Sequence, residues 1–394
     1  MASETLTFPT RALVDQIAAG EPAWLTERRL RALDETASLQ LPTSKQTRFE
    51  EAAFAQAASA PIAPEVRVEA APDGVVLMDL RDALRERPDL LEPHLLKVFE
   101  RQNLLHAQHA SLTQGGLLCY VPKGTELKDP LRATIHFAED AYYAPHILMV
   151  ADELTKVDLI VELLGEPGKA PVINGGVELV AKAGAQVRYI EFQRLPGKAQ
   201  SHWPRRASLG RDARLYWILN DIGARLQVAD TRTELAGNGA ESRVLATFFG
   251  GRRQHFDFRH VAVHVGQHTT SDTEARGVLQ GKARTVYNAN TVIRPGAIGT
   301  SGWQHEHTLM LSEAARADLV PELEIDEWDV KAGHAASAGP VDPLQLYFIM
   351  ARGIPEIEAR RLIVFGFLSS LLESIPLESV RERIAELFHE KVEA

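Results

Sequence analysis

The sequence is poor in cysteine, in long apolar runs and in excess positive charge. Cys119 is the only cysteine of 394 residues, so the chain alone cannot form an internal disulfide or an all-cysteine metal site. The formal net charge of −10 gives no reason to expect a nucleic-acid partner. No apolar run approaches the roughly 20 residues that cross a bilayer. The first residues also lack the basic and apolar regions of a secretory signal. We therefore expect no membrane partner and a cytoplasmic location.

Common catalytic motifs are also missing. The stretch Gly165-Glu166-Pro167-Gly168-Lys169 has neither the full spacing of a phosphate-binding loop nor the hydroxyl residue that would hold magnesium. It is interpreted as a turn. The sequence contains no nucleophile elbow and no zinc-protease motif. We expect this chain not to be an enzyme, and any ATP hydrolysis to belong to a partner.

Residues 1–110 are predicted to form a mainly helical region. Pro22 suits the first turn of a helix, and a second helical pattern runs from Leu80 to Leu105. An Ala/Pro-rich stretch between the two, residues 55–72, is typical of a linker. The apolar residues that recur near one face of the first helix are Trp24, Leu25, Leu30 and Leu33.

Residues 111–337 show a different pattern, with short alternating apolar runs separated by Gly, Asn and Asp. This pattern predicts a long all-β core, which could be a sandwich, a large barrel or a β-helix. Pairs of small or turn-forming residues precede the strands at irregular separations, which suits a solenoid whose coils vary in length. These pairs are Gly184-Ala185, Asp212-Ala213, Gly223-Ala224, Gly239-Ala240, Lys282-Ala283 and Ala314-Ala315.

Residues 338–394 are predicted to be helical. Asp342 fits the N-cap of a helix with Pro343 in its first turn, and Gly353 fits its end. A second helix begins after Pro355, and its segment 362–368 is apolar nearly all round. This segment is either internal core or a surface that packs on the body with one face and on a partner with another. A last helix is expected from Leu377 to Val392.

The single cysteine and several histidines are candidate metal ligands that also have structural interpretations. Cys119 lies in an apolar run and is interpreted as a small buried residue. His305 and His307 share one face of any strand, as do the histidines at 260, 264 and 268 if their strand continues unbroken. Polar ladders on a sheet face explain these spacings as well as a metal site does.

Several ordered motifs make the chain resemble the SufB/SufD family of iron–sulfur cluster assembly proteins. The N-terminal Pro22-Ala23-Trp24, with Arg28-Arg29 and Leu41-Pro42, is similar to the SufD branch rather than the SufB branch. The strongest similarity runs from residue 260 to residue 376. Its elements are His264–Ser271, Arg276–Leu279, Gly281–Arg284, Pro295–Ala297, Leu311-Ser312, Pro321–Ile325, Val330-Lys331 with His334, Tyr347-Phe348, Ala351–Pro355, Glu358–Arg360, Gly366–Leu368 and Ile375-Pro376.

The resemblance implies a fold and partners that the pattern alone leaves open. The expected fold is mainly β, a right-handed parallel β-helix core flanked by N-terminal and C-terminal helical segments. Family members pair as a SufB–SufD heterodimer through the end of the β-helix, and each binds one SufC ATPase through its C-terminal helices. The SufC contacts implied for this chain are Tyr347, Phe348, Arg352, Ile363, Phe365 and Phe367.

The resemblance also implies a site for the transient cluster. The family carries a Cys-x-His element where this chain has Ala332-Gly333-His334, so only the histidine remains. Imidazole is a competent iron ligand, whereas thiolates usually hold most of a cluster. We therefore expect His334 to supply one iron or cluster ligand at the SufB interface, and the chain alone to bind no stable cluster. The expected role is that of an accessory scaffold.

Two other functions are weighed against this one. A SufB-like scaffold that works as a homodimer is disfavoured by Ala332, although a homodimer of the isolated chain is left open. Parallel β-helices also serve as polysaccharide-active enzymes, which need clustered carboxylates. The acids of segment 322–329 could supply such a cluster, but Glu322 and Glu324 belong to the family motif.

Overall fold

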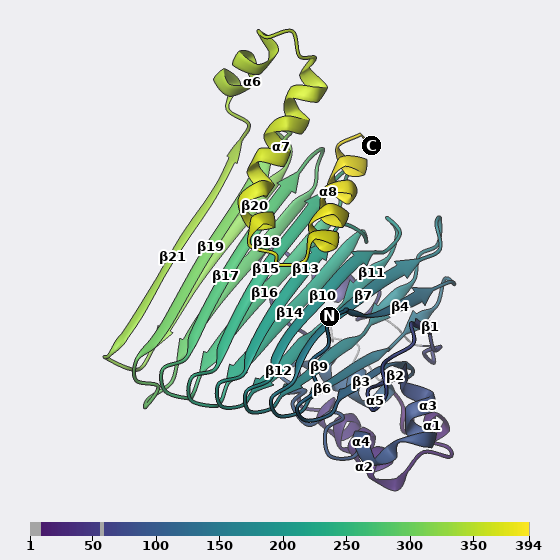
Figure 1. Ribbon diagram of the computed structural model, residues 1–394. Coiled ribbons are helices and arrows are strands. Elements are labelled where there is room, and N and C mark those ends of the chain that lie inside the picture. The colour runs from purple at the N-terminus through teal and green to yellow at the C-terminus, as the bar shows by residue number, and fades with distance from the viewer. Residues whose placement is uncertain (1–8, 56–58, 394) are drawn as a thin grey trace.

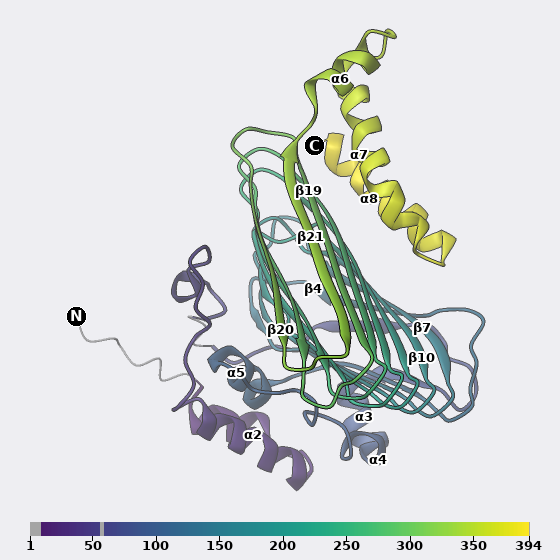
Figure 2. The same ribbon diagram turned by 90° about the vertical axis from the view of Figure 1, so that its left-hand side faces the viewer.

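The computed structural model describes residues 9–55 and 59–393. The first residues, in which a secretory signal is expected to be missing, lie largely outside this range. The described chain consists mainly of strands stacked in two sheets, with helices at both ends of the chain (Figure 1). Figure 2 shows the N-terminal and C-terminal helices on opposite sides of the stack.

The first sheet has 9 strands among the described residues. In spatial order they are β1 (Glu65–Val68), β4 (Leu131–Phe137), β7 (Lys156–Gly165), β10 (Gln186–Arg194), β13 (Arg214–Asp221), β15 (Glu241–Gly250), β17 (Thr270–Leu279), β19 (Thr300–Met310) and β21 (Val330–Pro340).

The second sheet has 12 strands among the described residues, and β14 is the point at which it branches. In chain order they are β2 (Val76–Asp79), β3 (Gly116–Val121), β5 (Tyr142–Tyr143), β6 (His146–Ala151), β8 (Val172–Asn174), β9 (Gly176–Ala181), β11 (Gln200–His202), β12 (Arg205–Leu209), β14 (Leu226–Leu235), β16 (His255–His264), β18 (Arg284–Ile293) and β20 (Arg316–Ile325).

The chain alternates between the two sheets and so winds into a parallel β-helix, which confirms the expected fold class. Within the described chain, the antiparallel pairs are β1 with β4 and β2 with β3, and the other strand pairs are parallel. The length of a coil varies. Register partners are 27 residues apart between Arg214 and Glu241, and 31 apart between Thr270 and Ser301. This variation explains why the turn signals in the sequence are irregularly spaced.

The coils turn into the first sheet at corners with a shared construction. A residue with positive φ makes the bend, and a small buried alanine or threonine follows it inside the corner. Three of the pairs that the sequence marks as turns are such corners, at Gly184, Asp212 and Gly239. Positive φ suits glycine, and aspartate tolerates it better than most residues. The other corners of this kind bend at Leu154, His268 and Gly299.

Helices cover the outer faces of both sheets. Those of the N-terminal region are α1 (Arg11–Ile17), α2 (Ala23–Glu35), α3 (Leu80–Glu86), α4 (Pro88–Leu91) and α5 (Leu104–Leu112), with a short 3-10 turn at Phe49–Glu51. Those of the C-terminal region are α6 (Pro343–Met350), α7 (Glu356–Glu373) and α8 (Glu378–Glu393). None of the described helices is both long enough and apolar enough to span a membrane.

The C-terminal helices follow their sequence signals closely. Asp342 caps α6 by accepting the Leu344 N–H at 2.9 Å, and Pro343 occupies its first turn. The helix ends before Gly353, whose φ is +84°. Helices α7 and α8 then pack on the outer face of the first sheet. The buried residues of that contact are Ile160, Ile190, Phe192, Ile218, Ile222, Leu245, Phe249 and Val278 from the sheet, with Val364, Leu368, Leu371, Ile375, Val380, Ile384, Leu387, Phe388 and Val392 from the helices.

The predicted linker at residues 55–72 is wrong in part. Glu65–Val68 forms β1, which pairs with β4 and starts the first sheet, while Ile62 makes a bridge to Tyr143. Residues 56–58 of this stretch lie outside the described range. The strand was missed because alanine and proline surround it, and these residues dominate a composition-based prediction.

Candidate functional site

No described strand pairs with the outer edges of the last coil of the β-helix. Strand β21 pairs only with β19 and strand β20 only with β18 in the described chain, so one backbone edge of each is unpaired. These two strands, of 11 and 10 residues, lie at the front of the stack in Figure 2. Unpaired strand edges of this length expose a row of N–H and C=O groups. We call this surface the open end.

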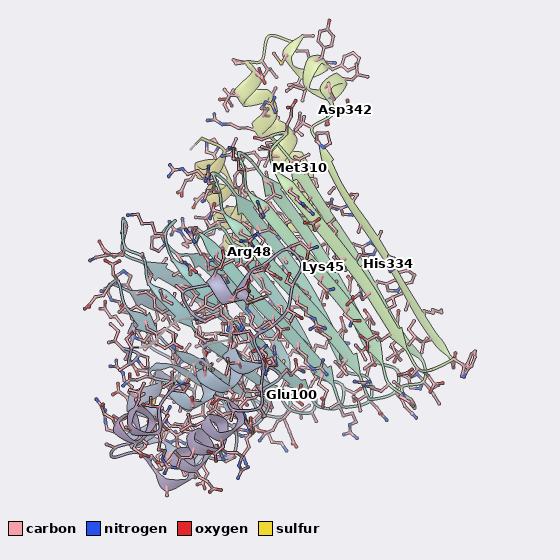
Figure 3. The ribbon with its side chains drawn as sticks, turned by 180° about the vertical axis from the view of Figure 1, so that it is seen from behind. Lys45, Arg48, Glu100, Met310, His334 and Asp342 are labelled. Carbon is pink, nitrogen blue, oxygen red and sulfur yellow. The ribbon has the colours of Figure 1, made fainter. Side chains whose placement is uncertain are left out.

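His334 lies on the side of β21 that faces the inside of the β-helix. Figure 3 shows it near the middle of this outermost strand. Its register partner on β19 is Gln304, which is buried, and parallel register puts the two side chains on the same face. Both belong to one row of inward-facing residues, which changes from apolar to polar toward the open end. The row runs Leu159, Tyr189, Trp217, Val244, Thr273, Gln304, His334.

The surroundings of His334 leave its imidazole accessible. The side chain is exposed, and within the described chain its ring makes no hydrogen bond. The other residues of β21 on this face are Val330 and Pro340 at its two ends and the alanines at 332, 336 and 338. His334 is therefore the one polar side chain that this strand presents on that face. An imidazole in this position is free to bind a metal ion that approaches from outside the chain.

A buried carboxyl group lies next to His334, one coil deeper. Glu306 of β19 is buried and is the register partner of Ala336, and neither of its carboxyl oxygens has a hydrogen-bond partner in the described chain. Burial raises the pKa of Glu306 to about 8, so the group is largely protonated at neutral pH. The sequence analysis did not single it out. An unpaired acid in a buried position is a candidate second group for a cation bound at the open end.

Glu306→Gln is expected to change how stability depends on pH. The pKa of Glu306 is raised from 4.5 to about 8 in the folded protein, so the folded state binds this proton more tightly between those values. The free energy of unfolding of the wild type should therefore fall, relative to the variant, as pH rises through this window. The limiting slope is about 1.4 kcal/mol per pH unit. Urea unfolding of both proteins at pH 5, 6.5 and 8 measures it, and parallel curves would show that Glu306 is ionised throughout.

The other histidines that the sequence indicated do not converge. His305 and His307 of β19 lie on the outer face, and His307 Nδ1 is 2.6 Å from Ser337 Oγ. His264 is inside the β-helix, where its two ring nitrogens each lie 2.8 Å from a hydroxyl oxygen. His268 belongs to a corner, because β16 ends at His264. Among the residues that the structure describes, no group of three His, Cys, Asp or Glu side chains could hold a metal ion.

Cys119 is a core residue, as its sequence context indicates. It lies on β3 among apolar side chains of the β-helix interior and is fully buried. Burial raises the pKa of its thiol to about 12. The thiolate form that binds iron is therefore not populated at neutral pH. This chain offers the open end an imidazole and a carboxyl group but no thiolate.

Comparison with known proteins settles the family. The family model for the SUF system FeS cluster assembly SufBD core domain matches residues 134–367, and the model for the SufBD protein N-terminal region matches residues 62–133. The chain belongs to the SufBD family. It is 30% identical to the iron–sulfur cluster assembly protein SufD of Bacillus subtilis, over 94% of this chain and 95% of that protein.

Two further SufBD-family relatives are more distant. The iron–sulfur cluster assembly protein SufB of Bacillus subtilis is 27% identical over 77% of this chain and 66% of that protein. A SufBD family protein of Mycobacterium tuberculosis is 28% identical over 73% of this chain and 74% of its own length. The SufD similarity thus extends over more of both chains than the SufB similarity does, which agrees with the N-terminal motifs.

In this SufBD-family chain the C-terminal helices leave one apolar surface bare. Tyr347 and Phe348 of α6 are 64% and 57% exposed, and Arg352 is exposed as well. Phe365 and Phe367 are half-buried, and the Arg276 guanidinium lies 5.2 Å from the centre of the Phe367 ring.

Ile363 is the most deeply buried of the six SufC contacts that the resemblance implies. It is only 7% exposed, so it packs within the chain and has little surface left for a partner. Leu344, Ile357 and Leu362 are further exposed apolar residues of α6 and α7. The sequence pattern does not distinguish the buried Ile363 from the exposed Leu362, because segment 362–368 is apolar nearly all round.

Two of the acids near the open end have structural partners. Glu324 accepts a hydrogen bond from Asn290 Nδ2 at 2.6 Å. Glu327 accepts the backbone N–H groups of Trp328 and Gly296 at 2.8 and 2.9 Å, and these bonds lower its pKa. Both carboxylates therefore have structural partners. This arrangement gives no support to a polysaccharide-active enzyme.

A buried histidine cluster joins the N-terminal region to the β-helix, and sequence reasoning missed it. Glu178 of β9 accepts backbone N–H groups from segment 96–99, and its Oε2 lies 3.3 Å from His146 Nε2. His146 Nδ1 in turn lies 3.0 Å from Nε2 of His109, on the fully buried helix α5. Every member of the cluster has a partner in the chain, so we assign it a structural role.

Proposed function

We propose that this chain is a SufD-like accessory scaffold subunit, which pairs with a SufB-type protein to support iron–sulfur cluster assembly and iron delivery. The observation that carries the proposal is the open end. It combines two long unpaired strand edges with an inward-facing row that ends in one accessible imidazole. Such edges pair readily with another chain, so a partner with complementary edges is needed to cover them.

The cluster in this proposal is cargo at the interface of the two proteins. His334 supplies one nitrogen ligand, and Glu306 is close enough along the same sheet to respond to the charge of the metal. Thiolates hold most clusters, and this chain has alanine at position 332 and a buried, protonated cysteine at 119. The sulfur ligands must therefore come from SufB. The isolated chain holds no stable cluster and has no catalytic role of its own.

The C-terminal helices are the proposed contact for a SufC-type ATPase. Helix α6 projects beyond the strand stack in Figure 1, and its residues Tyr347 and Phe348 are 64% and 57% exposed. Arg352 Nη1 donates to the Phe348 carbonyl oxygen at 2.6 Å, which holds this charge beside the apolar surface. Exposed aromatic and arginine side chains are typical of strong interface contacts.

Coexpression with SufB and SufC tests the assembly. The expected result is a complex of all three proteins that elutes together in size exclusion, whereas the isolated chain gains no cluster after anaerobic reconstitution. A stable cluster on the isolated chain would contradict the need for ligands from SufB. Elution of the chain apart from both proteins would contradict the proposed partners.

His334→Ala is expected to reduce cluster assembly on the complex several-fold without dissociating it, because the variant removes a metal ligand but leaves the strand edges intact. His305→Ala is the matched control. His305 is also an exposed histidine, on the neighbouring strand β19, but it lies on the outer face. Cluster absorbance and iron content, measured per complex, give the readout. Equal losses in the two variants, or none in either, would remove the ligand role.

A further inference from the structure

A cavity of about 710 Å³ lies at the corner where the coils pass from the first sheet to the second. Its walls are the turns that follow β7, β10, β13, β15 and β17, and the C-terminal end of α8 closes one side. Stacked coils place equivalent turns above one another, so residues far apart in sequence share this wall. The rejected phosphate-loop stretch contributes Gly168 and Lys169. Neither the open end nor the exposed surface of α6 includes any of these residues.

The cavity wall is strongly basic although the protein as a whole is acidic. Among the described residues that line it, the one acid is Glu390. Lys169 is paired with Asp140 at 3.5 Å, and Lys391 donates to Gln254 Oε1 at 3.4 Å. The remaining four cations make no ion pair within the described residues. The six basic residues are Lys169, Lys198, Arg225, Arg252, Arg253 and Lys391.

A second basic cavity of about 610 Å³ continues the first, because Arg225 and Arg253 line both. It adds Arg284 and Lys282, together with Arg48 on the N-terminal segment, which crosses the strands of the second sheet in Figure 3. The second cavity also includes Glu51, which pairs with Arg48 at 2.9 Å, whereas Arg225 and Arg253 make no ion pair in the described chain and lie where the two cavities meet.

Burial first, and a neighbouring arginine second, lower the pKa of two groups on this surface. The pKa of Lys391 is lowered by burial and by the nearby Arg252 guanidinium. The pKa of His255, in the second cavity, is lowered to about 4, by burial first and by Arg284 second. Arg252 and Arg284 make no ion pair within the described residues, and a multivalent anion would lower the repulsion between such neighbouring cations.

The floor of the first cavity is apolar. Leu195 and Ile222 are almost completely buried there, with Pro196 beside them. A volume of this size suits a small organic molecule, since ligand pockets typically span about 300 to 1,000 Å³. Arginine binds phosphate groups through paired hydrogen bonds, and lysine binds them as a point charge. The cavity therefore combines contacts for phosphate groups with a surface for an apolar or aromatic moiety.

We propose that this cavity binds an organic diphosphate of the nucleoside diphosphate type. Arg225 and Arg253 are the central phosphate contacts, and Leu195, Pro196 and Ile222 contact the organic part. The site is a binding site without hydrolysis, because its wall carries a single acid and the chain lacks the magnesium-binding hydroxyl of a phosphate loop. It does not depend on the role of the open end, so either proposal can fail alone.

Isothermal titration calorimetry on the full chain, with ADP, pyrophosphate and adenosine as probes, tests this site. At low ionic strength ADP should bind more tightly than pyrophosphate, and adenosine should give no detectable heat. Raising the salt concentration should weaken ADP binding, because exposed charges are screened. Equal affinity for ADP and pyrophosphate would overturn the organic part of the proposal, and no heat from ADP would overturn all of it.

A charge-matched pair of double variants locates the site. Arg225→Glu/Arg253→Glu should weaken ADP binding by about tenfold or more, since two charge-assisted contacts become repulsive. Lys128→Glu/Arg211→Glu changes the net charge equally at exposed positions outside both cavities and should leave ADP affinity unchanged. Equal weakening of ADP binding in both double variants would show that the effect comes from net charge and not from this site. If the first variant loses a protein partner while ADP binds neither protein, the surface is a docking site for an acidic protein instead.

Discussion

Replacing Glu191 by glutamine is expected to lower the free energy of unfolding by about 3 to 5 kcal/mol. Glu191 and Arg205 form an ion pair inside the β-helix, and both side chains are only about 1% exposed. Glu191 also accepts hydrogen bonds from Tyr189 and Trp203, at 2.9 and 3.0 Å. Removing its charge leaves the Arg205 guanidinium buried without its counterion, and an unpaired buried charge strongly destabilises the folded state.

The expected loss of stability comes from leaving the Arg205 charge unpaired in the core, and not from a large net stabilisation by the ion pair. A double variant separates these two contributions. Glu191→Leu/Arg205→Met removes both charges and should be less destabilised than Glu191→Gln, although it loses more hydrogen bonds. Asp318→Asn, at the exposed pair with Arg316, is the surface control and should cost less than about 1 kcal/mol. Chemical denaturation followed by circular dichroism gives the values. A Glu191→Gln variant as stable as the control would show that Arg205 is neutralised by another group, and nearby Asp221 is the candidate.

The alternation of apolar residues and the helix signals were enough to predict the order of the elements, but not which face of each strand points inward. Glu191 and Arg205 occur in strands where charged residues normally face solvent. A shift of one residue in the strand register turns the inward-facing side chains outward. Pairing with the strands of the neighbouring coils decides which register forms. On β19, the sequence indicated the histidines at 305 and 307 as candidate ligands. The structure instead places the buried carboxyl group of Glu306, which lies between them, on the inward face. Long-range register, which single-strand patterns do not contain, decides such cases.

The C-terminal region shows the opposite situation. The cap at Asp342 and the spacing of Val380, Ile384, Leu387 and Phe388 are local signals, and the structure confirms the helices that they predict. For segment 362–368, local signals do not predict which residues are buried. Its residues are apolar on nearly every side, so the buried Val364 and the exposed Leu362 look alike in sequence. Local chemistry thus predicts where a helix forms, and contacts with the body decide which face stays bare.

Trp328→Ala is expected to weaken pairing with SufB by about 2 to 4 kcal/mol, which corresponds to a loss of roughly 30- to 1,000-fold in affinity. Trp328 lies in the turn that joins β20 to β21, the two unpaired strands of the open end. It is 98% exposed, which is rare for so large an apolar side chain. Sequence reasoning passed over it because a lone aromatic residue in the acidic stretch 326–329 has no periodicity.

The turn that carries Trp328 is held in place before any partner binds. Glu327 accepts the backbone N–H groups of Trp328 and Gly296, so the indole is presented from a fixed backbone and little ordering is needed on binding. Titration of the purified chain with SufB measures the affinity. Leu154→Ala is the control, because Leu154 is a 63% exposed apolar residue on a turn of an inner coil. The thermal stability of the isolated Trp328→Ala chain should not change, since its side chain is almost fully solvated. Unchanged affinity in this variant would place the partner away from the turn between β20 and β21.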